Sequence, residues 1–174
     1  MRLLAYCLMP NHFHLVLWPR EDGDLSVWMQ WLMTSHVRRY HRHYHSSGHV
    51  WQGRFRSFPI RTGKHLLAVV RYVEQNPVRA KGLVTQRVDD WPWSSAGRPI
   101  GDEASPRIDL DELIPDARDL LPRQLSMNML TAIKESLQRG RPLGPPDWQA
   151  EISKQLGLGS TLRPRGRPRK EASK

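Results

Sequence analysis

Residues 3–18 read LLAYCLMPNHFHLVLW and contain two apolar segments with a turn between them. The first segment, residues 3–8, suits a buried strand. Met9-Pro10-Asn11 interrupts it, because proline has no N–H to give to a strand ladder and asparagine favours turns. Residues 12–18 then read as a second strand. We therefore expect two consecutive strands at the start of the chain.

The second strand carries the pair His12 and His14. Side chains alternate along a strand, so the two imidazoles share one face and point together. Together they offer two of the several donors that a metal ion needs. The alternative is two unrelated, half-exposed histidines. We expect the other face, which bears the leucines, to meet the core. The histidine face also carries Val16 and Trp18, and the opposite face carries Phe13, Leu15 and Leu17.

Tyr72 and Asn76 form a second candidate pair. A helix is expected from about residue 63 to Asn76, because Pro77 disfavours the helical conformation at the residue before it. Residues four apart lie on one helical face, about one turn from each other. A tyrosine hydroxyl can act as a nucleophile, and an amide oxygen can complete a metal's coordination shell. The alternative is that Tyr72 packs and Asn76 caps the helix.

The other elements are expected from periodicity and from turn residues. Apolar residues at spacings of three and four predict a helix from Asp24, as N-cap, to about His45. Residues 54–61 alternate and predict an edge strand, because they include Pro59. Residues 89–95 are expected to form a loop with Trp91 and Trp93 as anchors. Weaker helices are expected over residues 109–121, 124–138 and 147–156.

Composition divides the chain into three parts. Residues 1–95 are expected to form a catalytic domain, residues 96–160 a helical C-terminal extension, and residues 161–174 a disordered basic tail. Lys and Arg number 27 against 17 Asp and Glu, and the net charge is +10. This charge favours nucleic acid as a partner. The apolar runs are too short to span a bilayer, and one cysteine excludes a disulfide framework, so cytoplasm is the expected compartment.

Basic and aromatic residues interleave between residues 36 and 56, as single-stranded or hairpin nucleic acid requires. A solvated helix face is the alternative. The candidate DNA contacts here are Arg38, Arg39, Arg42, Trp51, Arg54 and Arg56. Alternate residues on a helix diverge, so His41, His43 and His45 are not expected to form a metal site. In the tail, Arg165, Arg167 and Arg169 surround Gly166 and Pro168 in the form of an AT-hook core. A nonspecific electrostatic tail is the alternative.

Four blocks together resemble the single-tyrosine HUH transposases, and most closely their REP-associated tyrosine transposase branch. Residues 5–17, AYCLMPNHFHLVL, resemble the MPNHxHL signature. Residues 48–55, GHVWQGRF, resemble that branch's GHLWQGRF block, and residues 71–80, RYVEQNPVRA, its RYIxxNPVRA block. Residues 91–95, WPWSS, resemble its YPWSS segment. The blocks follow the family's order and span residues 5–95.

The resemblance implies a ferredoxin-like α+β domain whose antiparallel sheet carries the histidine pair. It implies that His12, His14 and Asn76 bind a divalent metal, Mg²⁺ or Mn²⁺, and that Tyr72 is the nucleophile. Family members nick and rejoin single-stranded DNA, often at hairpin-forming palindromic repeats, through a 5′-phosphotyrosine link. A strand and a helix usually precede the segment that begins here at Met1. Their absence implies a truncated gene, a wrongly assigned start or a shortened variant.

Two other functions are compatible with the same residues. One is an inactive, domesticated remnant that binds DNA hairpins without cleaving them. The other is a metal-dependent phosphodiester hydrolase that uses an activated water on His12 and His14. Substitution of Tyr72 separates them from a transposase, because only the transposase needs the tyrosine hydroxyl for cleavage. The oligomeric state, monomer or dimer, is left open.

Overall fold

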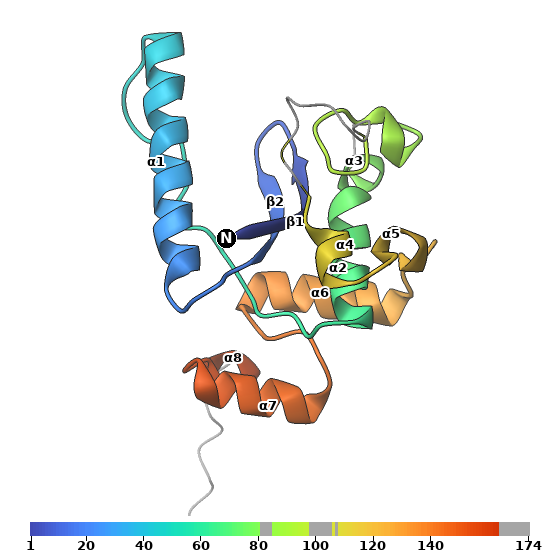
Figure 1. The fold of residues 1–174 in the computed structure, drawn as a ribbon. Coiled ribbons are helices and arrows are strands. Elements are labelled where there is room, and N and C mark those ends of the chain that lie inside the picture. Colours follow the sequence, from blue (N-terminus) through green and yellow to red (C-terminus); the bar gives the residue numbers. More distant parts are fainter. Residues whose placement is uncertain (81–84, 98–105, 107, 164–174) are drawn as a thin grey trace, which may run out of the picture.

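The computed structural model describes residues 1–80, 85–97, 106 and 108–163, and it shows an α+β fold (Figure 1). Within these residues, β1 (Arg2–Leu8) and β2 (Phe13–Trp18) form a two-stranded antiparallel sheet, which confirms the two predicted strands, but His12 lies just before β2 and not within it. The N–H of Met9 donates to the carbonyl of His12 at 2.9 Å and closes the turn between the strands. The wider ferredoxin-like arrangement stays a prediction.

Helix α2 (Lys64–Glu74) packs against the sheet on the face that carries the histidines. Val16, which shares that face with His14, is 2% exposed, whereas Leu15 and Leu17 on the other face are only half-buried. The prediction that the leucine face meets the core is therefore wrong. Burial follows the position of the packed helix, because α2 presents a row of buried apolar side chains to the histidine face. These are Leu66, Val69, Val70 and Val73.

Cys7 lies in β1, one residue before the strand ends. It pairs with His14 across the two strands and is fully buried. Its thiol contacts the sulfur of Met9 at 3.6 Å. Burial, and after it the negative charge of Glu74, raises the pKa of Cys7 to about 11. The thiol therefore belongs to the packed core.

The helices that follow α2 are short, except α6 and α7. The predicted helix over 109–121 is two separate turns, because Pro115 falls between them. The helices predicted over 124–138 and 147–156 are confirmed as α6 and α7. The bounds are α3 Asn76–Arg79, η1 Val88–Asp90, α4 Leu110–Leu113, α5 Ala117–Leu120, α6 Met127–Arg139, α7 Pro146–Gln155 and α8 Gly159–Leu162. No helix of the described residues is long and apolar enough to cross a membrane.

A single hydrophobic core joins these helices to the sheet. Residues on both sides of the predicted boundary at residue 95 contribute to it. The C-terminal contributors are Leu110, Ala117, Leu121, Ile133 and Leu143, each less than 10% exposed. They pack with β1, β2 and α2, so the sheet is supported by side chains from much later in the chain.

Helix α1 (Asp24–Tyr44) stands apart from this body (Figure 1). Met29 is its one buried residue, while Val27 and Trp31 are 70% and 61% exposed. The helix begins after Gly23, whose φ of 90° suits glycine. The Asp24 carboxylate accepts the N–H groups of Arg20 and Glu21, so Asp24 holds the preceding turn and is not the predicted N-cap.

Residues 54–61 do not form the predicted strand. They run extended to one isolated parallel bridge, between Ile60 and Leu143. The Arg61 N–H donates to the Leu143 carbonyl at 2.9 Å, and the Leu143 N–H donates to Pro59 at 2.8 Å. Pro59 has no N–H to continue a ladder, which limits the pairing to this bridge.

Candidate functional site

The structure brings His12, His14 and Tyr72 together. The rings of His12 and His14 lie with their centroids 5.1 Å apart and nearly perpendicular. The ring of Tyr72 lies edge to face with that of His14, 6.2 Å between centroids. Tyr72 comes from α2, which packs on the histidine face of the sheet. The packing of α2 on β2 therefore also brings Tyr72 to His14. The predicted clustering of these three residues is observed.

The two histidines differ in their surroundings. His12 is exposed, and its Nδ1 lies 2.7 Å from the side-chain oxygen of Asn11. His14 is partly buried, and this burial lowers its pKa to about 4, with His12 and Arg79 adding repulsion. His14 is therefore neutral at pH 7. A neutral imidazole keeps a lone pair for a metal ion.

Asn76 lies one turn beyond Tyr72, at the start of α3. Its amide nitrogen donates to the backbone carbonyl of Tyr72 at 3.1 Å. This bond ties the predicted third ligand to the residue that carries the predicted nucleophile, and it leaves the amide oxygen as the end that can accept or coordinate. The predicted ligand set of two imidazoles and one amide oxygen would suit a divalent ion with water or phosphate in its remaining positions.

Other clusters of metal-ligating side chains are not found among the described residues. Those residues contain no group of three or more His, Cys, Asp or Glu side chains that could hold a metal. His41 is instead held at the end of α1, with its ring nitrogens 3.0 Å from the Ser46 hydroxyl and from the Gly48 carbonyl.

A buried acid, Glu74, holds α2 from the side away from Tyr72. It is 1% exposed and pairs with Arg118 of α5. The Ser95 hydroxyl donates to the same carboxylate at 2.9 Å, and Ser95 also bonds the backbone of Tyr6 in β1. Sequence reasoning missed this residue. An acidic side chain within an apolar helical run is the signal that could have found it.

Two further contacts fix the same helix to the segment after α5. Arg71 Nε donates to the carbonyl of Pro122 at 2.8 Å, and Gln75 Nε2 donates to that of Arg123 at 3.4 Å. Arg71, Glu74 and Gln75 lie at helical spacing, so one face of α2 contacts residues 118–123. Tyr72 meets His14 from a different face.

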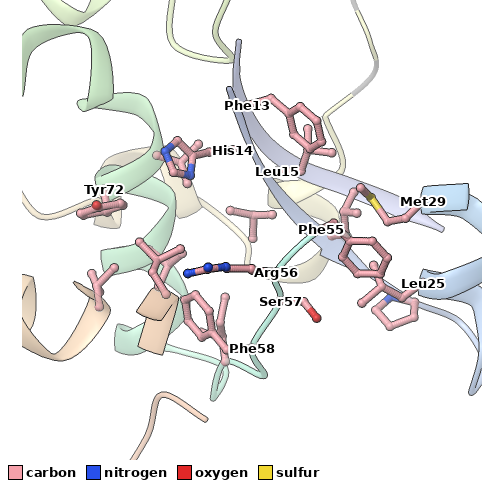
Figure 2. A pocket seen from close by; sticks show the side chains of 18 residues that line it. Phe13, His14, Leu15, Leu25, Met29, Phe55, Arg56, Ser57, Phe58 and Tyr72 are labelled. Carbon is pink, nitrogen blue, oxygen red and sulfur yellow. The ribbon is translucent and has the colours of Figure 1, made fainter. Parts of the chain in front are cut away.

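A pocket adjoins the histidine and tyrosine rings, and Arg56 lines it (Figure 2). Figure 2 shows the Arg56 side chain extending from the residue 55–58 segment toward α2, on the side of the pocket where His14 and Tyr72 lie. The other walls are apolar and include Phe55, Phe58 and Met29. Of the predicted DNA contacts, Arg56 is thus the one placed beside the candidate catalytic residues.

The other predicted DNA contacts lie elsewhere. Arg38, Arg39 and Arg42 are exposed on α1, and Arg54 is exposed in the loop that follows. Trp51 is half-buried. Its ring packs on those of His36 and Phe13, 4.8 and 5.3 Å between centroids, and its Nε1 donates to the Met33 carbonyl at 3.4 Å. Trp51 therefore joins the loop to α1 and β2. Arg165, Arg167 and Arg169 lie outside the described residues.

The comparisons with known proteins concern the part of the chain that carries these residues. Residues 1–76 match the family described as "Transposase IS200 like", a range that contains both histidines, Tyr72 and Asn76. This part of the chain is therefore similar to the IS200-like transposases. The chain is also 32% identical over 114 residues to a Haemophilus influenzae protein named "Putative REP-associated tyrosine transposase". That match covers 59% of this chain and 63% of the relative, so the chain spans less than two thirds of the relative's length. No solved structure matches the chain significantly.

The family match covers only the first part of the chain. The family range ends at Asn76, just after α2. Arg118, Pro122 and Arg123, which hold α2, all lie beyond that range. The residues that hold the helix of the candidate nucleophile therefore lie outside the family match.

Proposed function

We propose that this chain is a DNA transposase-type endonuclease and strand transferase that cleaves and rejoins single-stranded DNA at hairpin-forming repeats. The observation that carries the proposal is the ring contact between His14 on β2 and Tyr72 on α2, 6.2 Å between centroids. This contact supports the proposal because the Tyr72 hydroxyl can act as a nucleophile and lies beside a neutral imidazole, in the part of the chain that matches the family. The proposal includes a ferredoxin-like sheet to which β1 and β2 belong.

In the proposed reaction, the Tyr72 hydroxyl attacks a phosphorus atom of the DNA backbone in line. A bond forms between Oη and phosphorus, and the bond from phosphorus to the 3′ oxygen breaks. The phenolic proton passes to solvent, and the departing 3′ oxygen takes one up. The product is a 5′-phosphotyrosine link and a free 3′-hydroxyl. Because the phosphodiester bond energy is conserved, a 3′-hydroxyl can reverse the step and join strands.

His12, His14 and the Asn76 oxygen would hold a divalent ion, Mg²⁺ or Mn²⁺. Such an ion supplies charge that polarises the scissile phosphate and offsets the negative charge that develops on it. The protein's own part is to hold the donors in place. Asn76 is fixed by its bond to the Tyr72 carbonyl, and His14 is fixed between the sheet and the Tyr72 ring.

The exposed arginines of α1 and the loop after it supply a second element of the proposal. Arg38, Arg39 and Arg42 lie on one helix with the exposed rings of Tyr40 and Tyr44. Cations neutralise phosphates, and aromatic faces stack on unpaired bases. We propose that this surface holds the DNA while the histidine face cleaves it, and that the basic tail adds to the affinity. Since the substrate is chromosomal DNA, the protein acts in the cytoplasm at the nucleoid.

A covalent-adduct assay tests the proposal. The protein is mixed with Mn²⁺ and single-stranded hairpin oligonucleotides drawn from palindromic repeats that flank its gene, and the products are resolved on a denaturing gel. A shifted, metal-dependent band is expected, and Tyr72→Phe should abolish it. Tyr44→Phe is the matched control and should keep the band, because it removes only an exposed hydroxyl from α1 and keeps the aromatic ring that is proposed to stack on bases.

The other outcomes separate the competing functions. Cleavage that survives Tyr72→Phe without an adduct would identify a hydrolase. DNA binding by the parent without any cleavage would identify a DNA-binding remnant. His12→Ala and His14→Ala are expected to abolish cleavage and largely spare binding, because the proposed electrostatic contacts lie on α1.

A further inference from the structure

Arg79 is the charged group in direct contact with Tyr72. It is the last residue of α3, three positions after Asn76. Its guanidinium carbon lies 4.1 Å from the centroid of the Tyr72 ring, and its NH2 group donates to the Tyr72 backbone carbonyl. Pro77, buried at the start of α3, begins the turn that brings Arg79 back over the tyrosine. Neither the predicted nucleophile set nor the predicted metal set includes this residue.

The charge of Arg79 lacks an acidic partner among the described residues. Arg87, Arg118 and Arg141 pair there with Asp89, Glu74 and Glu135. Arg79 instead faces the Tyr72 ring, and its proximity contributes to the lowered pKa of His14. Burial also lowers the pKa of Arg79 itself, with the Tyr72 contact opposing that effect. A partly desolvated cation that has no carboxylate partner is stabilised when an anion from outside the protein binds to it.

We propose that Arg79 is a further catalytic residue, which binds the scissile phosphate of single-stranded DNA beside Tyr72. This inference rests on the proposed function, since it takes Tyr72 as the group that attacks the phosphate. The guanidinium uses one N–H on the Tyr72 carbonyl and has further N–H groups for phosphate oxygens. Its flat face on the phenol ring also fixes the direction of the ring.

The chemistry of the step explains why a fixed cation belongs here. Negative charge builds on the non-bridging oxygens as Tyr72 approaches phosphorus, and a positioned arginine stabilises that charge. Arg56 in the adjoining pocket and Arg79 on α3 come from different segments. The Tyr72 ring thus contacts both the His14 ring and the Arg79 guanidinium.

A purely structural role for Arg79 predicts different results, and two variants separate the roles. Arg79→Gln keeps an amide that can donate to the Tyr72 carbonyl and loses the charge. Arg79→Lys keeps the charge and loses the planar fork. If Arg79 only holds the Tyr72 carbonyl, the glutamine variant should act like the parent. Arg87→Gln is the matched control, because it removes an exposed arginine that pairs with Asp89.

The experiment measures two quantities for each variant. The first is the affinity for a single-stranded oligonucleotide at several salt concentrations without added metal, and the second is the rate of adduct formation with Mn²⁺. We expect Arg79→Gln to reduce the slope of log affinity against log salt by about 0.7, the value for one phosphate contact. We expect its adduct rate to fall by about 100-fold or more. Arg79→Lys should keep the slope and lose part of the rate.

Each result decides the proposal. If Arg79→Gln keeps both the parental slope and the parental rate, the proposal is overturned. If the parent forms no adduct, the proposed transposase function fails, and the salt slope alone then decides whether Arg79 binds a phosphate. A slope that falls in Arg79→Gln and not in Arg87→Gln supports phosphate binding in that case, and an unchanged slope overturns it. Unfolding curves of all variants confirm that each is folded.

Discussion

Helices α1 and α2 are built on opposite principles. In α2, seven of eleven residues are buried, and side chains on two of its faces contact other elements. In α1, Met29 is the one buried residue among twenty-one, and large side chains such as Trp31 and Tyr44 face solvent. The helix that carries the candidate nucleophile is fixed, and the helix that carries the predicted DNA contacts is free to present them. A catalytic side chain needs a fixed position, whereas DNA-binding side chains need to be accessible to the DNA.

The largest loss of stability is expected when the contact between Glu74 of α2 and Arg118 is broken. Arg118→Met leaves the buried carboxylate of Glu74 without its cation and should lower the free energy of unfolding by about 3 kcal/mol. Urea unfolding followed by circular dichroism measures this loss. The control Arg87→Met breaks an exposed pair and should cost less than about 0.5 kcal/mol. Equal losses in the two variants would mean that Glu74 does not depend on Arg118.

A matched valine pair compares the two helices directly. Val70→Ala in α2 removes methyl groups from a position that is 0% exposed, and we expect it to lower the free energy of unfolding by about 2 kcal/mol. Val27→Ala in α1 alters a side chain that is 70% exposed and should change it by less than about 0.5 kcal/mol. The same unfolding assay serves both. A substantial loss from Val27→Ala would show that α1 has a partner in solution.

The smallest energetic effect is expected on binding. Replacing Arg38 and Arg42 with Gln removes two exposed charges from α1 and should weaken single-stranded DNA affinity by about tenfold, or about 1.4 kcal/mol. The salt slope should fall by about 1.4, twice the value for one contact. Fluorescence anisotropy at several salt concentrations measures both. Unaltered affinity would remove α1 from the DNA-binding surface, whereas unaltered stability is expected in either case.

Local pattern predicted the elements better than their partners. Two apolar segments separated by Pro10 and Asn11 located β1 and β2, and Pro77 located the end of α2. The buried face of β2 was predicted wrongly, because alternation separates two faces and does not say which one a distant helix covers. Residues 54–61 alternate like a strand, but a ladder also needs a neighbour that continues it, and only Leu143 is within reach of a bridge.

The candidate site shows the same division. The pairing of His12 with His14 follows from strand geometry, whereas their meeting with Tyr72 was expected only through the resemblance. Glu74 and Arg118 are 44 residues apart in sequence, and nothing local to either residue indicates their contact. Arg79 was missed because its contact with Tyr72 depends on the separate turn that follows α2.

The fully buried Cys7 can serve as a chemical probe for opening of the sheet. Thiol reagents attack the thiolate, and a thiol whose pKa is raised to about 11 and which lies out of reach of solvent should stay unlabelled while β1 and β2 are paired. Because the sequence contains one cysteine, each labelling event counts one opening of the sheet beneath His14. The labelling rate, followed with and without DNA or Mn²⁺, then reports how often the strand that carries the histidines separates from its partner.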